Sequence, residues 1–239
     1  MRLIKIPDNK YYEYKINAMF DCYKWDPQFC DSNTLSRYVL ILNKKENNEV
    51  IHLTENLDKE TRLAEEYINK HIKLTKKLSL PRKIVEQLNN ISNYESKKNI
   101  RLMRYDFHPS IDNSWVVTEV NSDCPGGFAE SSLLPNLARK KINMPELKYK
   151  SFGEQMVSAI NNKLEKKGTI MMLHCTCFSD DRQVMQYLGD RLKREGYKVI
   201  YGAADHINFR QNRAFCILEN NQEEINLILR FTPLEWLIQ

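Results

Sequence analysis

The sequence has no long apolar run, and no stretch of its 239 residues could span a lipid bilayer. The apolar core of the first ten residues is too short for a secretory signal. Internal repeats and low-complexity tracts are also missing, and the composition is ordinary for a globular protein. We therefore expect a cytoplasmic protein with no membrane partner.

The loops that mark common cofactor and catalytic sites are absent too. Residues 174–181 follow an expected buried strand, yet they contain neither a dinucleotide-binding glycine pattern nor a P-loop. A Rossmann-type cofactor site is therefore not expected. The sequence also lacks a Ser-His-Asp arrangement with a nucleophile elbow. A thiol nucleophile at Cys124 would have only His108 near it in the sequence, and we do not favour it.

Cysteines and basic residues are present, but without a pattern that assigns them to a metal or to nucleic acid. The six cysteines are expected to be free thiols in a cytoplasmic chain. Cys175 and Cys177 lie close in sequence, but structural zinc usually needs a second such pair, which this sequence lacks. The formal net charge is +5, and lysine pairs are scattered instead of forming a basic stripe. We expect no nucleic-acid partner.

Hydrophobic periodicity predicts an α/β fold with mixed sheets and flanking helices. The expected helices are 10–23, 57–78, 81–91, 128–134, 152–166, 179–195 and a short one around 222–225. The expected strands are 37–42, 49–53, 100–107, 115–120, 168–175, 197–201, 215–218 and 227–231. Residues 168–201 are an expected βαβ crossover on a covered parallel sheet. A polar turn is expected at 43–48, with Asn56 as the next N-cap, and Pro135 is expected to kink or end its helix.

The most informative stretch is 101–130, which begins with two expected strands joined by a turn. Arg104 and Asp106 are two residues apart on one strand, and Glu119 and Asn121 are two apart on the other, so each pair leaves one face of its strand. Carboxylate and amide oxygens suit Mg²⁺, and an arginine suits phosphate or carboxylate. A hairpin would join these groups into one site. The alternative is a solvated polar face with a cross-strand salt bridge.

A loop of mostly small side chains follows the second strand. It contains Cys124, Gly126 and Gly127, and such a loop lets a ligand approach the backbone closely. This loop favours a binding site over a bare polar face. Glu130, near the start of the next expected helix, could approach a cation or an amine substrate, or it could be a favourable charge at a helix N-terminus.

The segments 104–107 (Arg-Tyr-Asp-Phe) and 119–125 (Glu-Val-Asn-Ser-Asp-Cys-Pro) together resemble the core motif of the glutathionylspermidine synthase-like family. These proteins are ATP-grasp ligases with a rearranged order of ATP-grasp elements. Residues 229–237 resemble a second family motif, and the two motifs stand in the expected order. The resemblance extends more loosely from about residue 11 to the last residue. It implies a pre-ATP-grasp-like substrate domain plus part of an ATP-grasp domain.

The resemblance implies ATP-dependent amide-bond formation between two small molecules, a peptide-like acid and an amine. It implies that Arg104 binds the γ-phosphate and the substrate carboxylate, and that Asp106, Glu119 and Asn121 bind Mg²⁺ with ATP. Backbone at Cys124, Gly126 and Gly127 would line the acid, although relatives often carry hydroxyl side chains there. Similar family members carry an acidic pair facing the amine, which points to Asp180 and Asp181. From the residues alone, these two and Ser179 could instead cap a helix.

Two regions are expected in the chain. Residues 1–138 form an N-terminal α/β region that carries the metal and phosphate hairpin at 101–127, and residues 139–239 form a βαβ-containing substrate-side region. The family's catalytic unit continues with lysines for the ATP phosphates and a segment around the adenine, whereas this sequence stops at Gln239. We expect the C-terminal half of the ATP-grasp domain to be absent, with a second chain or missing segment completing the ATP site and little activity from this chain alone. The alternative is a non-catalytic binding or interaction protein.

Overall fold

The computed structural model describes residues 1–91, 94–98, 101–112, 114–218 and 222–237. The chain forms two compact units, each assembled from separate segments. The first unit contains Met1, Leu42–Pro125 and Pro233–Gln239, and the second contains Arg2–Ile41 and Gly126–Thr232. The expected division into 1–138 and 139–239 would cut a continuous helix, α4 (Phe128–Lys141), and as a division of function it stays a prediction.

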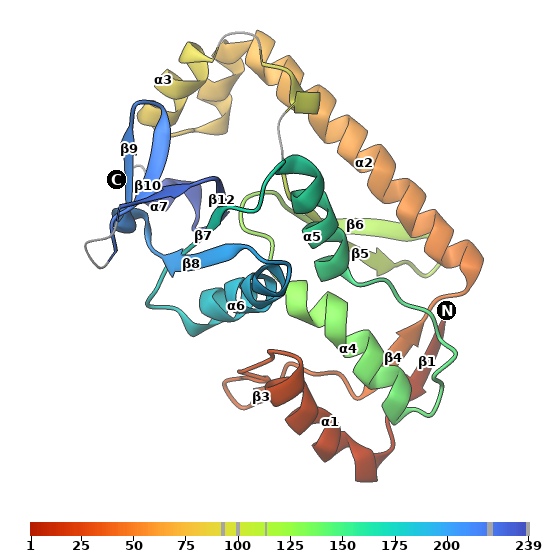
Figure 1. Cartoon of the computed structure of the whole chain (residues 1–239). Coiled ribbons are helices and arrows are strands. Elements are labelled where there is room, and N and C mark those ends of the chain that lie inside the picture. The colour runs from red at the N-terminus through yellow and green to blue at the C-terminus, as the bar shows by residue number, and fades with distance from the viewer. Residues whose placement is uncertain (92–93, 99–100, 113, 219–221, 238–239) are drawn as a thin grey trace. The chain divides into compact units, whose positions relative to one another are not determined.

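The first unit combines helices with one two-stranded sheet (Figure 1). Its elements are α2 (Lys44–Lys70), the 3₁₀ helices η1 (Ile72–Leu78) and η2 (Ser96–Lys98), α3 (Arg82–Asn90), β5 (Arg104–Pro109), β6 (Trp115–Asn121) and α7 (Leu234–Leu237). The hairpin and the helix after Pro81 are confirmed. The expected long helix 57–78 is confirmed as far as Lys70, where it gives way to η1.

Helix α2 begins much earlier than the sequence analysis predicted. The turn at 43–48, the strand at 49–53 and the N-cap at Asn56 are all wrong, because these residues lie at the start of α2 or within it. Asn43 is the N-cap: its Oδ1 accepts the Glu46 N–H at 2.9 Å, and its own N–H donates to Glu46 Oε2 at 2.8 Å. This reciprocal pair is a capping box, which satisfies two helix N–H groups at once. Glu46 also forms an ion pair with the terminal nitrogen of Met1.

The second unit holds the remaining elements. They are β1 (Arg2–Lys5), α1 (Asp8–Asp21), β2 (Gln28–Phe29), β3 (Ser32–Asn33), β4 (Tyr38–Ile41), α4, α5 (Phe152–Lys163), β7 (Thr169–His174), α6 (Ser179–Arg194), β8 (Lys198–Gly202), η3 (Ala204–His206), β9 (Ile207–Arg210), β10 (Arg213–Cys216), β11 (Glu223–Ile225) and β12 (Leu227–Phe231). The expected helix at 222–225 is wrong, because β11 pairs antiparallel with β10 through Ile225 and Ala214.

A three-stranded parallel sheet in the order β12-β7-β8 forms the centre of the second unit. Its middle strand is buried throughout, and Ile170, Met171 and Met172 have no exposed surface. Helix α6 connects β7 to β8 and packs against both strands, which confirms the βαβ crossover (Figure 1). The helix is followed by Gly196, whose φ of 88° is readily available only to glycine.

Of the two outcomes expected at Pro135, a kink or the end of its helix, the second is wrong. Helix α4 continues through it to Lys141. An internal proline costs roughly 3 kcal/mol through a lost hydrogen bond and a backbone clash. The continuation is favoured by packing, because Leu134, Leu137 and Ala138 belong to the apolar cluster around Tyr14 and Ala18 of α1. Burial of this face outweighs the local propensity.

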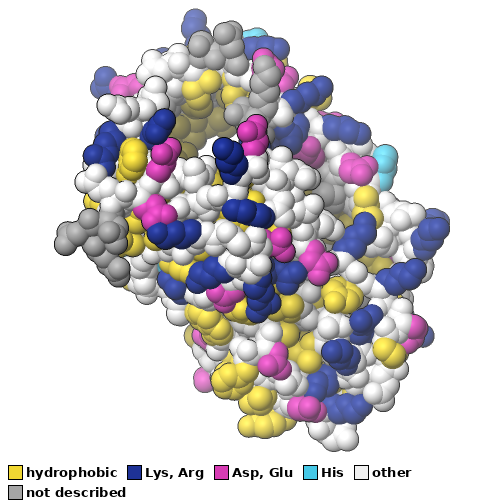
Figure 2. All heavy atoms as spheres, viewed as in Figure 1, with side chains coloured by type: hydrophobic (Ala, Val, Ile, Leu, Met, Phe, Trp, Pro, Cys, Tyr) yellow, Lys and Arg dark blue, Asp and Glu magenta, His cyan; other side chains and the backbone are white. Residues whose placement is uncertain are grey.

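The expected α/β class, with small mixed sheets and flanking helices, is confirmed. Among the described residues, no helix combines the length and apolarity needed to cross a membrane. On the face shown in Figure 2, basic and acidic side chains are interspersed rather than separated into patches. This agrees with a modest net charge spread along the sequence.

The N-terminal boundary of α2 can be tested by removing its cap. Replacing Asn43→Ala should lower the free energy of unfolding by about 1 kcal/mol, because the Glu46 N–H loses its partner, the Asn43 side-chain oxygen. Urea unfolding followed by circular dichroism measures this change. Asn48→Ala is the matched control: it removes an exposed asparagine inside the same helix and should be neutral or slightly stabilising. Equal stability of the two variants would show that α2 does not begin at Asn43.

Candidate functional site

The β5–β6 hairpin brings together the four polar residues that the sequence analysis selected. The strands pair antiparallel, with Arg104 opposite Asn121 and Asp106 opposite Glu119. Directly opposed residues on antiparallel strands point to the same face. All four side chains therefore share one face of the hairpin, as predicted.

A β-bulge lies immediately beyond this group. The register shifts between Asp106 and Phe107, so that Phe107 pairs with Val117 and Thr118 is the extra residue on β6. A bulge increases local twist and re-aims nearby side chains, and bulges are common next to functional sites. The two opposed pairs lie on the regular side of the bulge, which keeps their alternation intact.

The other face of the hairpin is anchored to α2. The Tyr105 hydroxyl lies 3.1 Å from Thr61 Oγ1. Just before β5, Arg101 donates to the Asp58 carboxylate at 2.7 Å and also pairs with Glu65. These contacts leave the Arg104–Asp106 face as the face turned away from α2.

The polar face is internally paired. Arg104 binds Asp106 through two parallel hydrogen bonds, from Nε to Oδ1 at 2.7 Å and from Nη2 to Oδ2 at 2.8 Å. Asn121 Nδ2 donates to Glu119 Oε1 at 2.7 Å. The Arg104 guanidinium holds the pKa of the Asp106 carboxyl below its usual value, mainly by hydrogen bonding. Asp106 is therefore charged at neutral pH.

The donor set fits Mg²⁺ in its usual protein setting. Mg²⁺ is commonly bound by one or two carboxylates together with waters and substrate phosphates, and Asp106 and Glu119 provide two carboxylates opposite each other. Within the described residues, no group of three or more His, Cys, Asp or Glu side chains is arranged to hold a metal ion. A Mg²⁺ ion here would complete its coordination with water or substrate phosphates.

The loop after β6 is held by a residue that the sequence analysis did not assign a role. Asp123 Oδ2 accepts the backbone N–H of Leu234 at 2.9 Å, at the first residue of α7. This bond joins the two segments that carried the family resemblance, 119–125 and 229–237. The sequence offered one indication of this contact: both segments resemble motifs of the same family.

The predicted acid-binding loop divides between the two units. Cys124 is half-buried, forms no disulfide and lies at the end of the first unit's segment. Gly126 and Gly127 begin the second unit's segment, and Gly127 is the N-cap of α4 with φ 88°. A Cβ on Gly126 would make only ordinary contacts, whereas Gly127 needs its glycine for its backbone angle.

The predicted acidic pair lies in the first turn of α6. Asp180 is exposed and Asp181 is half-buried. Burial raises the pKa of Asp181, which accepts the backbone N–H of Cys175. Ser179 is not the cap, because Phe178 is the N-cap and makes no side-chain capping bond. Adjacent helix residues point in different directions, so the two carboxylates do not form one surface.

Glu130 approaches a cation within the second unit. Its Oε1 accepts from Lys24 Nζ at 3.2 Å and from Gln183 Nε2 at 3.3 Å. The other oxygen, Oε2, is buried and has no hydrogen-bond partner in the described part of the chain. Glu130 lies in the first turn of α4, where an acidic side chain is favourable. Its approach to a substrate amine stays a prediction.

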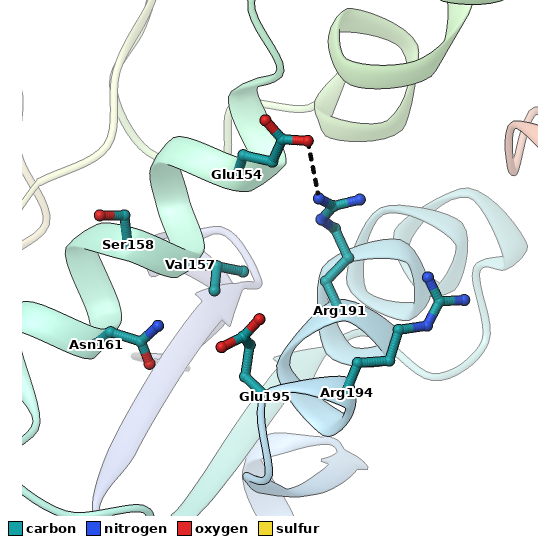
Figure 3. A pocket seen from close by; sticks show the side chains of 7 residues that line it. All are labelled: Glu154, Val157, Ser158, Asn161, Arg191, Arg194 and Glu195. Atoms are coloured by element: carbon teal, nitrogen blue, oxygen red, sulfur yellow. Dashed lines mark hydrogen bonds and ion pairs between the residues drawn. The ribbon is translucent and has the colours of Figure 1, made fainter.

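A surface pocket of about 330 Å³ lies between α5 and α6 (Figure 3). Its charged wall contains Glu154 and Arg191, whose side chains point toward each other and lie 3.5 Å apart. Arg194 and Glu195 line the pocket from the C-terminal end of α6. The balanced charges of this wall select no particular ligand, and no residue of the predicted site lines the pocket.

The coupling between Arg104 and Asp106 gives a pH prediction. A carboxyl with a lowered pKa adds stability above its unfolded-state pKa and loses it as the pH falls through the folded-state pKa. Arg104→Gln should raise the pKa of Asp106 and move this acid limb to higher pH. Titration of the ¹³C-labelled Asp106 carboxyl by NMR measures the change. Arg82→Gln removes an exposed arginine from an ion pair on α3 and should leave Asp106 unchanged. An unaltered Asp106 midpoint in Arg104→Gln would refute the coupling.

A search of curated proteins finds no match. Among protein families, residues 20–239 match the family described as glutathionylspermidine synthase preATP-grasp. The matched region includes the hairpin, the loop after it and α7, and it covers far more than half of the chain. The chain therefore belongs to the glutathionylspermidine synthase preATP-grasp family.

Proposed function

We propose that this chain contributes the Mg²⁺- and carboxylate-binding side of an ATP-dependent carboxylate–amine ligase. The observation that carries the proposal is the pairing of Arg104 with Asn121 and of Asp106 with Glu119 on one face of the hairpin. Family membership supports the same reaction class. The name of the family suggests a peptide-like acid and a polyamine as the substrates. Both are small molecules, and a further polypeptide segment would complete the nucleotide site.

Each of the four hairpin residues has a distinct role in this proposal. Arg104 binds phosphate or the substrate carboxylate through its planar fork. Asp106, Glu119 and Asn121 would hold the metal, and Asn121 would also orient Glu119 through its 2.7 Å hydrogen bond. When bound, Mg²⁺–ATP supplies activation of the acid by phosphoryl transfer, so that an amine can form the amide. Such chemistry relies on positioning and charge neutralisation more than on covalent help from the protein.

The Arg104–Asp106 ion pair is compatible with this role because it is weak enough to exchange. The Arg104 side chain is 41 % exposed and that of Asp106 is 33 % exposed. Ion pairs with this exposure contribute roughly 0–1 kcal/mol. A phosphate group can therefore replace Asp106 on Arg104 at little cost, and Asp106 then becomes available to a cation.

The remaining predicted residues are part of the same proposal. Backbone at Cys124, Gly126 and Gly127 would line the acid, and Asp180 and Asp181 would attract the amine. The exposure of Asp180 suits a first encounter with a cation, whereas Asp181 is already occupied by the Cys175 N–H. We assign the larger share of amine attraction to Asp180.

A non-catalytic binding protein derived from this fold is the second candidate. It is favoured by the mutual pairing of Arg104 with Asp106, which satisfies both groups without any ligand. The two candidates differ in their need for a metal. A ligase site binds the nucleotide only with Mg²⁺, whereas a simple anion-binding face needs no cation.

Calorimetric titration with a non-hydrolysable ATP analogue tests the proposal. We expect binding by the wild-type chain in the presence of Mg²⁺ and not in its absence. Glu119→Ala should weaken the Mg²⁺-dependent affinity by at least about tenfold, because it removes one of two carboxylates. Glu60→Ala is the control, since it removes an exposed carboxylate from α2 in the same unit.

The outcomes separate the candidates. Mg²⁺-dependent binding that is lost in Glu119→Ala and kept in Glu60→Ala supports the ligase site. Binding that is independent of Mg²⁺ supports the binding protein. Equal binding by both variants would contradict the proposed role of the hairpin. No binding by a folded wild-type chain would mean that the hairpin alone does not hold the nucleotide.

A further inference from the structure

Two cysteines lie in one tight turn at the carboxyl end of the central strand β7. The turn runs from Cys175 to Phe178, and the Phe178 N–H donates to the Cys175 carbonyl at 3.2 Å. The preceding residue, His174, is buried, with its Nδ1 3.1 Å from the Met172 carbonyl. The turn thus connects directly to the most buried part of the second unit, which limits how far its first cysteine can move.

The two thiols face each other. Cys175 Sγ and Cys177 Sγ are 3.2 Å apart, and both are free thiols. Cys175 is half-buried and Cys177 is exposed, so a small molecule in solution can reach the pair. The hydrogen bond to Cys175 raises the pKa of the Cys177 thiol.

The two sulfur atoms need to move only a short distance to form a disulfide. A disulfide bond is about 2.05 Å long, so the sulfurs need to approach each other by only about 1 Å. The loop that such a bond would close is very short, and a short loop gives little entropic stabilisation. Exposed disulfides with little stabilisation have higher reduction potentials and are the labile ones. The expected bond is therefore reversible and not a structural cross-link.

We propose that Cys175 and Cys177 form a redox-active dithiol that reacts with low-molecular-weight disulfides and closes to an internal disulfide. This inference is independent of the ligase proposal, because it rests on the turn and on the two sulfur positions alone.

The reaction is two successive thiol–disulfide exchanges. The Cys175 thiolate attacks an external disulfide RSSR, forming a Cys175–SR bond and releasing one thiolate, which takes up the proton that Cys175 lost. The Cys177 thiolate then attacks Cys175 Sγ, forming the Cys175–Cys177 bond and releasing the second RS⁻, which takes up the Cys177 proton. The protein dithiol loses two electrons, and the external disulfide gains them as two RSH molecules.

The full-length chain can be tested in buffers that contain 2-mercaptoethanol and hydroxyethyl disulfide in varied ratios. Remaining thiols are then blocked with N-ethylmaleimide, and the tryptic peptides are weighed by mass spectrometry. The tryptic peptide 168–182 contains Cys175 and Cys177 and no other cysteine. We expect it to lose two hydrogens and to carry neither maleimide nor mercaptoethanol. Cys30, an exposed thiol on β2–β3, is the internal control and should carry a mercaptoethanol adduct.

Two further comparisons isolate the contribution of the fold. The folded chain should form the internal disulfide at a buffer ratio at least about tenfold more reducing than the same chain in concentrated urea, because folding holds the sulfurs together. Cys175→Ser and Cys177→Ser each leave one thiol, which should stop at the mercaptoethanol adduct.

The proposal is overturned if peptide 168–182 of the folded wild-type chain accumulates a mercaptoethanol adduct. It is equally overturned if that peptide stays fully labelled with maleimide at ratios that convert Cys30. Identical midpoints for the folded and urea-unfolded chains would also overturn it. The wild-type measurement decides these points even if a serine variant fails to fold.

Discussion

One hydrogen bond, from the Leu234 backbone N–H to the Asp123 carboxylate, joins two of the chain segments that make up the first unit. The chain leaves this unit after Pro125 and returns to it at Pro233, so the bond joins the two crossing points. Asp123 lies only two residues beyond the end of β6, and it therefore fixes the exit of the candidate hairpin. The other crossing ends at Leu42, beside the capping box of Asn43 and Glu46. At each of these two points a carboxylate, that of Asp123 or that of Glu46, accepts a hydrogen bond from a backbone N–H.

The candidate site combines firm backbone geometry with weakly held side chains. Opposed residues on antiparallel strands must share a face, and a slip of one residue would move Glu119 to the other face. The anchoring of Tyr105 and Arg101 to α2 opposes such a slip. The four side chains are held less firmly than the backbone, because they are partly exposed and form hydrogen bonds with one another. A site built this way can keep its positions while it exchanges its partners for those of a ligand.

The parts that sequence reasoning predicted correctly are those where one local rule acts alone. The alternation of Arg104 with Asp106 and of Glu119 with Asn121 places these residues on a common face without further information. The bulge at Thr118 interrupts the alternation of faces, but it lies just outside this group. The burial of β7 followed from its nearly continuous apolar run, and the family followed from two short motifs.

The errors came from places where two rules compete. The polar stretch after Asn43 has the composition of a turn, and the residues up to Leu53 favour a strand. The Asn43–Glu46 capping box was the signal that would have identified a helix start. At Pro135, tertiary packing on α1 overcame the cost of an internal proline. The Asp123–Leu234 bond spans 111 positions, and no local pattern can predict such a contact.

This long span has a consequence for synthesis on the ribosome. The chain emerges from its N-terminal end, so residues 42–125 are available well before residue 234. Until the intervening segment of the second unit has been translated, the loop after β6 lacks its hydrogen bond to Leu234. Contacts between distant residues carry a high loop-closure cost and form late. During that interval the nascent hairpin face is exposed to chaperones, and the newly made protein is then most vulnerable to misassembly.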